Sequence, residues 1–243
     1  MSDAPTSHPP SGATANVLDL ARGLRPQSFG STSSKSIDDP LVEPLWTGIR
    51  VIAAAGGGAG ALLEDGSVVS GHADVADALG RTAASTADAV ILDGYLTKQA
   101  STDDAGVYTG VELTPSTGEF LTQTFIGKRR NRSEEMLQER EAQHAARTFE
   151  PNDVVALVAV DLLWLDGTWL LDVPLLERRR LLEAVVPGGE LIRPGMYVRP
   201  PIDAWIGSWR AQGFAGMTFK AANSRYRPSE IATDWATASM PRR

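Results

Sequence analysis

The sequence predicts an α+β fold, in which short antiparallel strands and amphipathic helices follow one another without the regular order of a doubly wound sheet. Three observations favour this class. An Asp-Gly pair at residues 65–66 stands between two short apolar runs, as in a tight hairpin. A nearly continuous apolar run at 154–160 is typical of a covered strand. Pro174 is suited to the first turn of the helix that follows.

The N-terminal part differs in composition from the rest of the chain. Residues 1–16 are rich in Pro, Ser and Ala and cannot bury enough apolar surface to offset the entropy of ordering. Apolar side chains recur at helical or irregular spacing in 17–24, and 26–40 is typical of a loop. We therefore expect a flexible leader over residues 1–40 and one domain over residues 41–243.

Strand and helix patterns then alternate along the domain. The glycine-rich run at 56–60 lacks the G-K-[ST] of a phosphate-binding loop, so we interpret it as a connecting turn. Residues 98–152 form a variable section. Apolar runs predict strands at 49–55, 61–63, 68–69, 89–92, 107–113, 120–126, 154–160 and 217–220. Helical patterns cover 72–82, 133–147, the segment from Pro174 to Pro187 and the segment around 205–209.

Composition excludes several classes of protein. A formal net charge of −7 argues against a protein that coats a phosphate backbone by itself. The absence of cysteine excludes disulfides and the usual structural zinc sites, and His8, His72 and His144 are too scattered for metal-ligand spacing. No secretory pattern or membrane-length apolar run is present. We expect a cytoplasmic protein without a membrane partner.

Six segments carry recognisable motifs. Residues 43–50 read E-P-L-W-T-G-I-R, 89–97 read A-V-I-L-D-G-Y-L-T, and 160–167 read V-D-L-L-W-L-D-G. Residues 173–179 read V-P-L-L-E-R-R, and 213–228 contain G-F-A-G-M-T-F-K followed by N-S-R-Y-R-P.

In this order the segments resemble motifs of the ATP-dependent DNA ligase adenylation domain, namely E-x-K-x-D-G-x-R, V-x-D-G-E-L-V, F-D-L-L-x-L-D-G, L-P-L-x-E-R-R, G-x-E-G-x-x-x-K and D-S-x-Y-x-P. The resemblance implies a nucleotidyltransferase domain with antiparallel sheets flanked by helices. The oligonucleotide-binding (OB) barrel that usually follows in the family is not expected within these residues. Chance matching of short motifs is the alternative, and their collinear order argues against it.

The departures from the family pattern mostly remove functional groups. The resemblance implies that Leu45 stands where a lysine amine attacks the α-phosphate of ATP, and leucine has no lone pair for this step. Aspartate and glutamate of the family pattern are also replaced in this chain. Carboxylates of this kind bind Mg²⁺, so no metal site is expected. Further replaced positions are Thr47 for aspartate, Tyr95 and Ala215 for glutamate, Thr237 and Ser239 for the phosphate-binding lysines, and Val160 for a phenylalanine against adenine.

Some charged residues match the family pattern. The resemblance implies that Glu43, Arg50, Lys220 and Arg227 could line a residual pocket, although Glu43 and Arg50 could equally be strand-edge charges. One dense basic run offers guanidinium groups for phosphate contacts, or is simply a solvated surface. It consists of Lys128, Arg129, Arg130 and Arg132.

These features favour a catalytically inactive ligase-like protein that acts by binding a protein partner or nucleic acid, in DNA repair or replication, without a cofactor. Two alternatives stay open. The chain could be an active ATP-dependent ligase that uses a non-standard nucleophile such as Lys220 or Lys98. Such an enzyme would need ATP and Mg²⁺. The chain could also be a residual nucleotide sensor.

Overall fold

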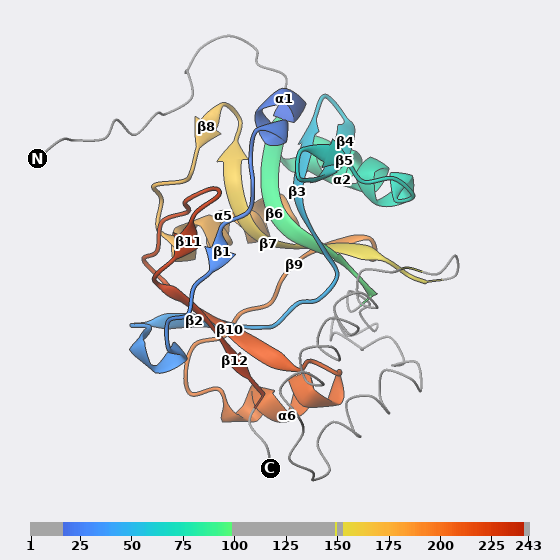
Figure 1. Cartoon of the computed structure of the whole chain (residues 1–243). Coiled ribbons are helices and arrows are strands. Elements are labelled where there is room, and N and C mark those ends of the chain that lie inside the picture. The colour runs from blue at the N-terminus through green and yellow to red at the C-terminus, as the bar shows by residue number, and fades with distance from the viewer. Residues whose placement is uncertain (1–16, 99–148, 150–152, 241–243) are drawn as a thin grey trace, which may run out of the picture.

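A large and a small antiparallel sheet organise the computed structural model (Figure 1). The structure describes residues 17–98, 149 and 153–240. The helices are α1 (Val17–Arg22), the short 3-10 helix η1 (Ser34–Ser36), α2 (Ala73–Thr86), α5 (Leu175–Val185) and α6 (Asp203–Ala211). The strands are β1 (Ser28–Phe29), β2 (Pro40–Pro44), β3 (Ile49–Gly56), β4 (Ala59–Glu64), β5 (Ser67–Val68), β6 (Ala89–Thr97), β7 (Ala156–Leu165), β8 (Thr168–Trp169), β9 (Ile192–Pro194), β10 (Gly216–Ala221), β11 (Ile231–Ala232) and β12 (Trp235–Ser239).

The large sheet has the order β5-β4-β3-β6-β7-β8, and β9 pairs in parallel with β7. Its central strands are largely apolar because both faces of the sheet are covered. In β3, Val51 and Ala53 pack in the core on one face, whereas Ile52 and Ala54 pack in the core on the other. The near-continuous apolar runs of the sequence therefore correspond to strands buried on two sides.

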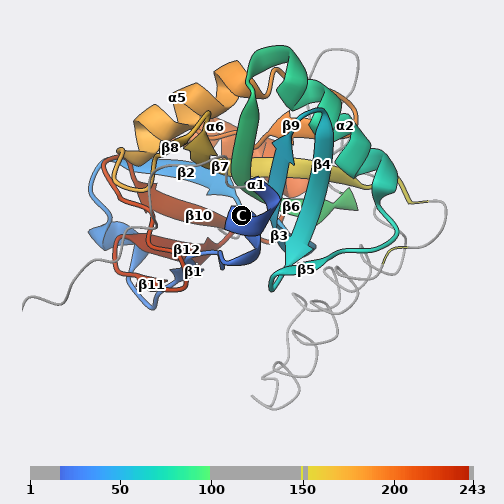
Figure 2. The same cartoon turned by 90° about the horizontal axis from the view of Figure 1, so that it is seen from above.

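Helices α2 and α5 lie together over one face of the large sheet (Figure 2). Val75, Leu79 and Ala83 recur at four-residue spacing along α2, which places them on one helical stripe, and all three are buried. The helix approaches the β3–β4 hairpin so closely that a Cβ on Gly80 would lie 2.4 Å from the carbonyl oxygen of Gly58. Glycine at position 80 is therefore a packing requirement.

The opposite face of the large sheet is covered by α1 and by residues near the C-terminal end of the described chain. Val17 and Ala21 of α1 are buried in a core cluster that also contains Tyr226 and Trp235. Strand β1 pairs in parallel with β11, so that Phe29 lies opposite Ala232. Residues 17–40, assigned from the sequence to the leader, thus pack on the domain because their few apolar side chains cover this face.

The small sheet has the order β12-β10-β2, and α6 lies beneath it (Figure 1). Met217 of β10, Trp209 of α6 and Phe214 of the connecting loop share one core cluster with Val42 of β2. A sharp turn leads from β2 into β3 at Gly48, whose φ of +123° is rarely adopted by other residues. A side chain there would also collide with the carbonyl oxygen of Leu96.

The observed elements agree with the α+β class predicted from the sequence. Strands β2 and β12 were not expected from any apolar run, and both belong to the small sheet. The strands predicted at 107–113 and 120–126 and the helix predicted at 133–147 lie outside the described residues. Among the described helices, none combines the length and apolarity needed to cross a bilayer.

Candidate functional site

One face of the small sheet gathers several of the positions at which the sequence departs from the motifs. In the strand register, Glu43 lies opposite Thr218, and Thr218 lies opposite Thr237. Directly opposed residues of an antiparallel sheet point to the same face, and so do residues two apart along a strand. Leu45, Lys220 and Ser239 therefore belong to this face too. We refer to it as the motif face.

Leu45 lies at the end of β2, beside the first residue of β10. Its backbone N–H donates to the carbonyl oxygen of Gly216 at 2.9 Å. A Cβ on Gly216 would lie 3.1 Å from a methyl carbon of Leu45, so the leucine side chain rests against the glycine. Ala215 and Ser239 are exposed beside it. This end of the motif face thus presents neutral side chains.

The other end of the motif face carries a buried ion pair. The Lys220 ammonium donates to Oε2 of Glu43 at 2.8 Å, and both side chains are almost fully buried. The ammonium lies 4.9 Å from the centre of the Trp235 ring, a distance suited to a cation–π contact. The Thr218 hydroxyl is 3.4 Å from the same carboxylate oxygen. The Lys220 side chain is therefore held in place by Glu43 and Trp235.

A second ion pair lies on the large sheet. Arg50 donates two hydrogen bonds to Asp93, at 3.0 and 2.7 Å, and the aspartate side chain is fully buried. The Arg50 guanidinium also lies 5.6 Å from the centre of the Tyr95 ring. Burial raises the pKa of the Tyr95 hydroxyl, and the positive charge of Arg50 lowers this pKa in part. The negative charges of Asp93 and Glu43 raise the pKa further. Tyr95 is thus subject to the charges of both ion pairs.

Tyr226 connects the Asp93 carboxylate to the N-terminal segment. Its hydroxyl donates to Asp93 at 2.8 Å and accepts from the backbone N–H of Gln27 at 3.1 Å. Burial raises the pKa of this hydroxyl well above its usual range, and the negative charge of Asp93 raises the pKa further. The network stabilises the contact between the N-terminal segment and the large sheet.

This shift predicts a loss of stability in alkali. Below about pH 10 the tyrosine is neutral in both the folded and the unfolded state. As the pH rises further, the unfolded state ionises first, so the free energy of unfolding falls. We expect Tyr226→Phe to show a smaller loss between about pH 9.5 and 11 than the unmodified chain, measured by urea denaturation. Tyr197→Phe is the control, and an equal change in both variants would contradict the assignment.

A third ion pair links β7 to α5. Asp161 lies directly opposite Asp93 in the paired strands, where the register shifts between β6 and β7. Arg178 donates two hydrogen bonds to Asp161, both at 2.8 Å, and both side chains are fully buried. Two adjacent buried carboxylates would repel each other, and each is neutralised by its own arginine, Arg50 or Arg178.

The structure brings together only part of the residual pocket predicted from the sequence. Glu43 and Lys220 contact each other, whereas Arg50 pairs with Asp93 on the other sheet. Arg227 lies on an exposed loop, and its guanidinium pairs with Asp172 at 2.9 Å. Among the described residues, no group of three or more histidine or acidic side chains could hold a metal ion. The basic run at 128–132 lies outside the described residues.

Sequence reasoning missed Asp93, Asp161, Arg178 and Tyr226 as polar residues around the site. The motif strings contain all four, but a string does not reveal which side chains are buried together. The signal that could have identified them is charge inside apolar strands. Asp93 and Asp161 each interrupt a strand whose other residues are almost all apolar, and such carboxylates require buried partners.

Comparison with known protein families shows the family of this chain. The sequence pattern of the ATP dependent DNA ligase domain matches residues 113–237, just over half of the 243 residues. The chain belongs to this ligase domain family. The matched range includes β7, α5, β10 and all but the last two residues of β12. Thr218, Lys220 and Thr237 of the motif face lie within the matched range, whereas Glu43, Leu45 and Ser239 lie outside it.

The ligase-family chain is similar to the multifunctional non-homologous end joining protein LigD of Mycolicibacterium smegmatis, with 36% identity over 77 residues. The match covers 32% of this chain and 10% of that protein. The ligase domain of Mycobacterium tuberculosis LigD has a similar structure, with a TM-score of 0.58 and 24% identity over 90% of this chain and 60% of that chain.

The ATP-dependent DNA ligase of bacteriophage T7, in its complex with ATP, is also similar in structure. Its TM-score is 0.52, with 12% identity over 88% of this chain and 68% of that chain. At these identities the likeness concerns the fold. It confirms the ligase-type nucleotidyltransferase fold expected from the motifs. The chain spans about 60% of the M. tuberculosis ligase domain.

Proposed function

We propose that this ligase-family chain is catalytically inactive and acts by binding. The observation that carries the proposal is Leu45 at the end of β2, where the family motif has its lysine nucleophile. Leu45 is followed by the tight turn at Gly48 and hydrogen-bonded to Gly216, which supports its alignment with the motif position. A hydrocarbon side chain has no lone pair with which to attack a phosphate, so the covalent route is closed at its first step.

The neutral end of the motif face supports the same proposal. Catalysts of phosphoryl transfer place cations against the charge that develops on the phosphate. Here Thr237 and Ser239 stand opposite Thr218 and Gly216, and Leu45 lies beside them. Among the described strand residues on this face, the one cation is Lys220, which is committed to Glu43, and Arg179 of α5 lies 3.9 Å from the same carboxylate. These residues do not fit the phosphates of ATP, and we propose that the chain needs neither ATP nor Mg²⁺.

The two lysines considered as substitute nucleophiles are both engaged. Nucleophilic attack by lysine requires an unprotonated amine. Lys220 lies 2.8 Å from Glu43 inside the domain, and Lys98 lies 2.5 Å from Asp153. Each amine is thus engaged by a carboxylate oxygen. This arrangement supports binding over an unrecognised enzymatic route.

We further propose that the binding role belongs to DNA repair. The support is the similarity to a protein whose name places it in non-homologous end joining. The net charge of −7 favours a protein partner over direct coating of DNA. In this proposal the ligase fold serves as a docking module.

Labelling with ATP tests the inactivity. The unmodified chain is incubated with α-³²P-labelled ATP and Mg²⁺ beside an active ATP-dependent ligase, and we expect no covalent label on the chain. Leu45→Lys tests whether the nucleophile alone is missing. Because the other charged groups are absent too, we expect its labelling to stay at least about 10²-fold below that of the active ligase.

A labelled band on the unmodified chain would overturn the proposal. Single Lys→Ala variants at the four lysines would then identify the nucleophile. These positions are Lys35, Lys98, Lys128 and Lys220.

A further inference from the structure

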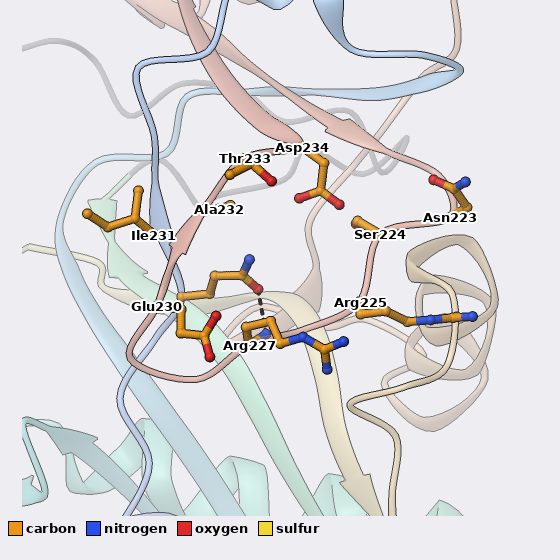
Figure 3. A pocket seen from close by; sticks show the side chains of 10 residues that line it. Asn223, Ser224, Arg225, Arg227, Glu230, Ile231, Ala232, Thr233 and Asp234 are labelled. Carbon is orange, nitrogen blue, oxygen red and sulfur yellow. Dashed lines mark hydrogen bonds between the residues drawn. The ribbon is translucent and has the colours of Figure 1, made fainter. Parts of the chain in front are cut away.

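A polar pocket lies at the opposite end of β10 from Leu45, in the loop that leads to β12 (Figure 3). Its volume is about 430 Å³, within the range of sites that hold ligands. The wall is formed by residues 223–225, 227 and 230–234 of this loop and by Gln27. We refer to it as the loop pocket. Because it is remote from Leu45, its occupancy is independent of nucleotidyl chemistry.

Gln27 provides a hydrogen-bond donor at the pocket wall. The residue is only 2% exposed. Its Oε1 accepts from the backbone N–H of Arg227 at 2.8 Å. Because that neighbour is a donor, the amide oxygen must face it, and the amide NH₂ faces the other way. Within the part of the chain that the structure describes, this NH₂ has no hydrogen-bond partner. The pocket therefore offers a fixed donor to an incoming carbonyl oxygen.

The acidic side chains of the loop pocket complement this donor. In Figure 3 the Asp234 carboxylate is directed into the pocket, and the Arg225 guanidinium is directed away from it. Arg227 is neutralised by Asp172 at 2.9 Å. Among the described residues, no side-chain hydrogen bond or ion pair occupies the carboxylates of Asp234 and Glu230. The carboxylates of Asp234 and Glu230 are therefore open to a cationic group from a ligand.

We propose that the loop pocket binds a segment of a partner protein through a lysine or arginine side chain and a neighbouring backbone carbonyl. The cationic group contacts Asp234 and Glu230, and the carbonyl accepts from Gln27. Ile231, which is 70% exposed at the pocket wall, adds apolar surface for a further side chain of the partner. A polyamine would offer a cationic group to the carboxylates but no carbonyl oxygen to Gln27. A nucleic acid presents phosphates that the two carboxylates repel.

A library of fluorescein-labelled octapeptides, each with one fixed residue at one position, tests the pocket by fluorescence anisotropy with the full chain. We expect at least a tenfold preference for fixed lysine or arginine over fixed glutamate at one or more positions. Asp234→Asn should weaken binding of the best peptide about tenfold or more, since a charged hydrogen-bond partner is removed. Gln27→Met should weaken it as well. Asp88→Asn, an exposed aspartate outside the pocket, should have no effect.

Three outcomes would overturn the proposal. The first is a library without any preference for basic residues. The second is an equal effect of Asp234→Asn and Asp88→Asn on the best peptide. The third is spermidine or a duplex oligonucleotide displacing the best peptide at the concentration of an unlabelled competitor peptide. If Gln27→Met does not fold, the comparison of the two aspartate variants still decides the question.

Discussion

Replacing Arg178 by methionine is expected to lower the free energy of unfolding by about 3–5 kcal/mol, because it removes one partner of a buried ion pair. Asp161 would be left without its arginine inside the domain, directly opposite Asp93 in the paired strands. The same guanidinium also donates to the backbone carbonyls of Val173 and Ser224, so the change would loosen the start of α5 and the loop after β10. Urea denaturation at neutral pH measures the effect.

Arg180 provides a matched control on the same helix. It pairs with Glu177 at 2.6 Å, and both side chains are largely exposed. Arg180→Met should therefore change the free energy of unfolding by less than about 1 kcal/mol. Replacing both members of the buried pair, as in Asp161→Leu with Arg178→Met, should recover part of the loss. Similar effects of the two single arginine variants would contradict the structural role assigned to Arg178.

The Glu43 and Lys220 pair is expected to give the second large effect. Glu43→Leu leaves the ammonium of Lys220 buried against Trp235 without its carboxylate, and should lower the free energy of unfolding by about 3–5 kcal/mol. The double variant Glu43→Leu/Lys220→Met replaces the pair with apolar side chains. Such replacement of a buried pair is often neutral or stabilising, so most of the loss should be recovered.

The exposed pair of Arg227 and Asp172 separates this effect from general surface electrostatics. Both side chains are about half exposed, so Asp172→Ala should cost less than about 1 kcal/mol. A double variant as unstable as Glu43→Leu alone would mean that the pair acts through shape or through further neighbours. In that case Thr218 and Arg179, which lie 3.4 and 3.9 Å from the Glu43 carboxylate, would be the next residues to vary.

The fold class could be predicted because the large sheet is covered on both faces, so its strands appear as apolar runs in the sequence. Strand β12 could not be predicted, since its sequence W-A-T-A-S contains one large apolar side chain. The pairing of β12 with β10 is determined by the neighbouring strand. Strand β2 begins and ends at prolines, which usually argue against a strand. The packing of residues 17–40 depends on contacts with the distant residues Tyr226 and Ala232.

The candidate site was predictable as far as motif positions and their chemistry are concerned. Leu45, Thr237 and Ser239 were identified from the motifs, and the strand register now places them on one face. The partners of the buried charges could not be foreseen, because pairs such as Arg50 with Asp93 join residues 43 positions apart. The donor of the loop pocket depends on a hydrogen bond between Gln27 and Arg227, 200 positions apart.

The parallel pairing of β1 with β11 has a consequence for biosynthesis. Strand β1 leaves the ribosome before its partner β11, which is made only after all the strands from β2 to β10. The bond from Gln27 to Tyr226 likewise spans 199 positions. Contacts this distant in sequence form slowly, since a long loop must close before they contribute. The nascent chain must therefore carry α1 and β1 undocked until β11 has emerged, with their apolar surface open to chaperones.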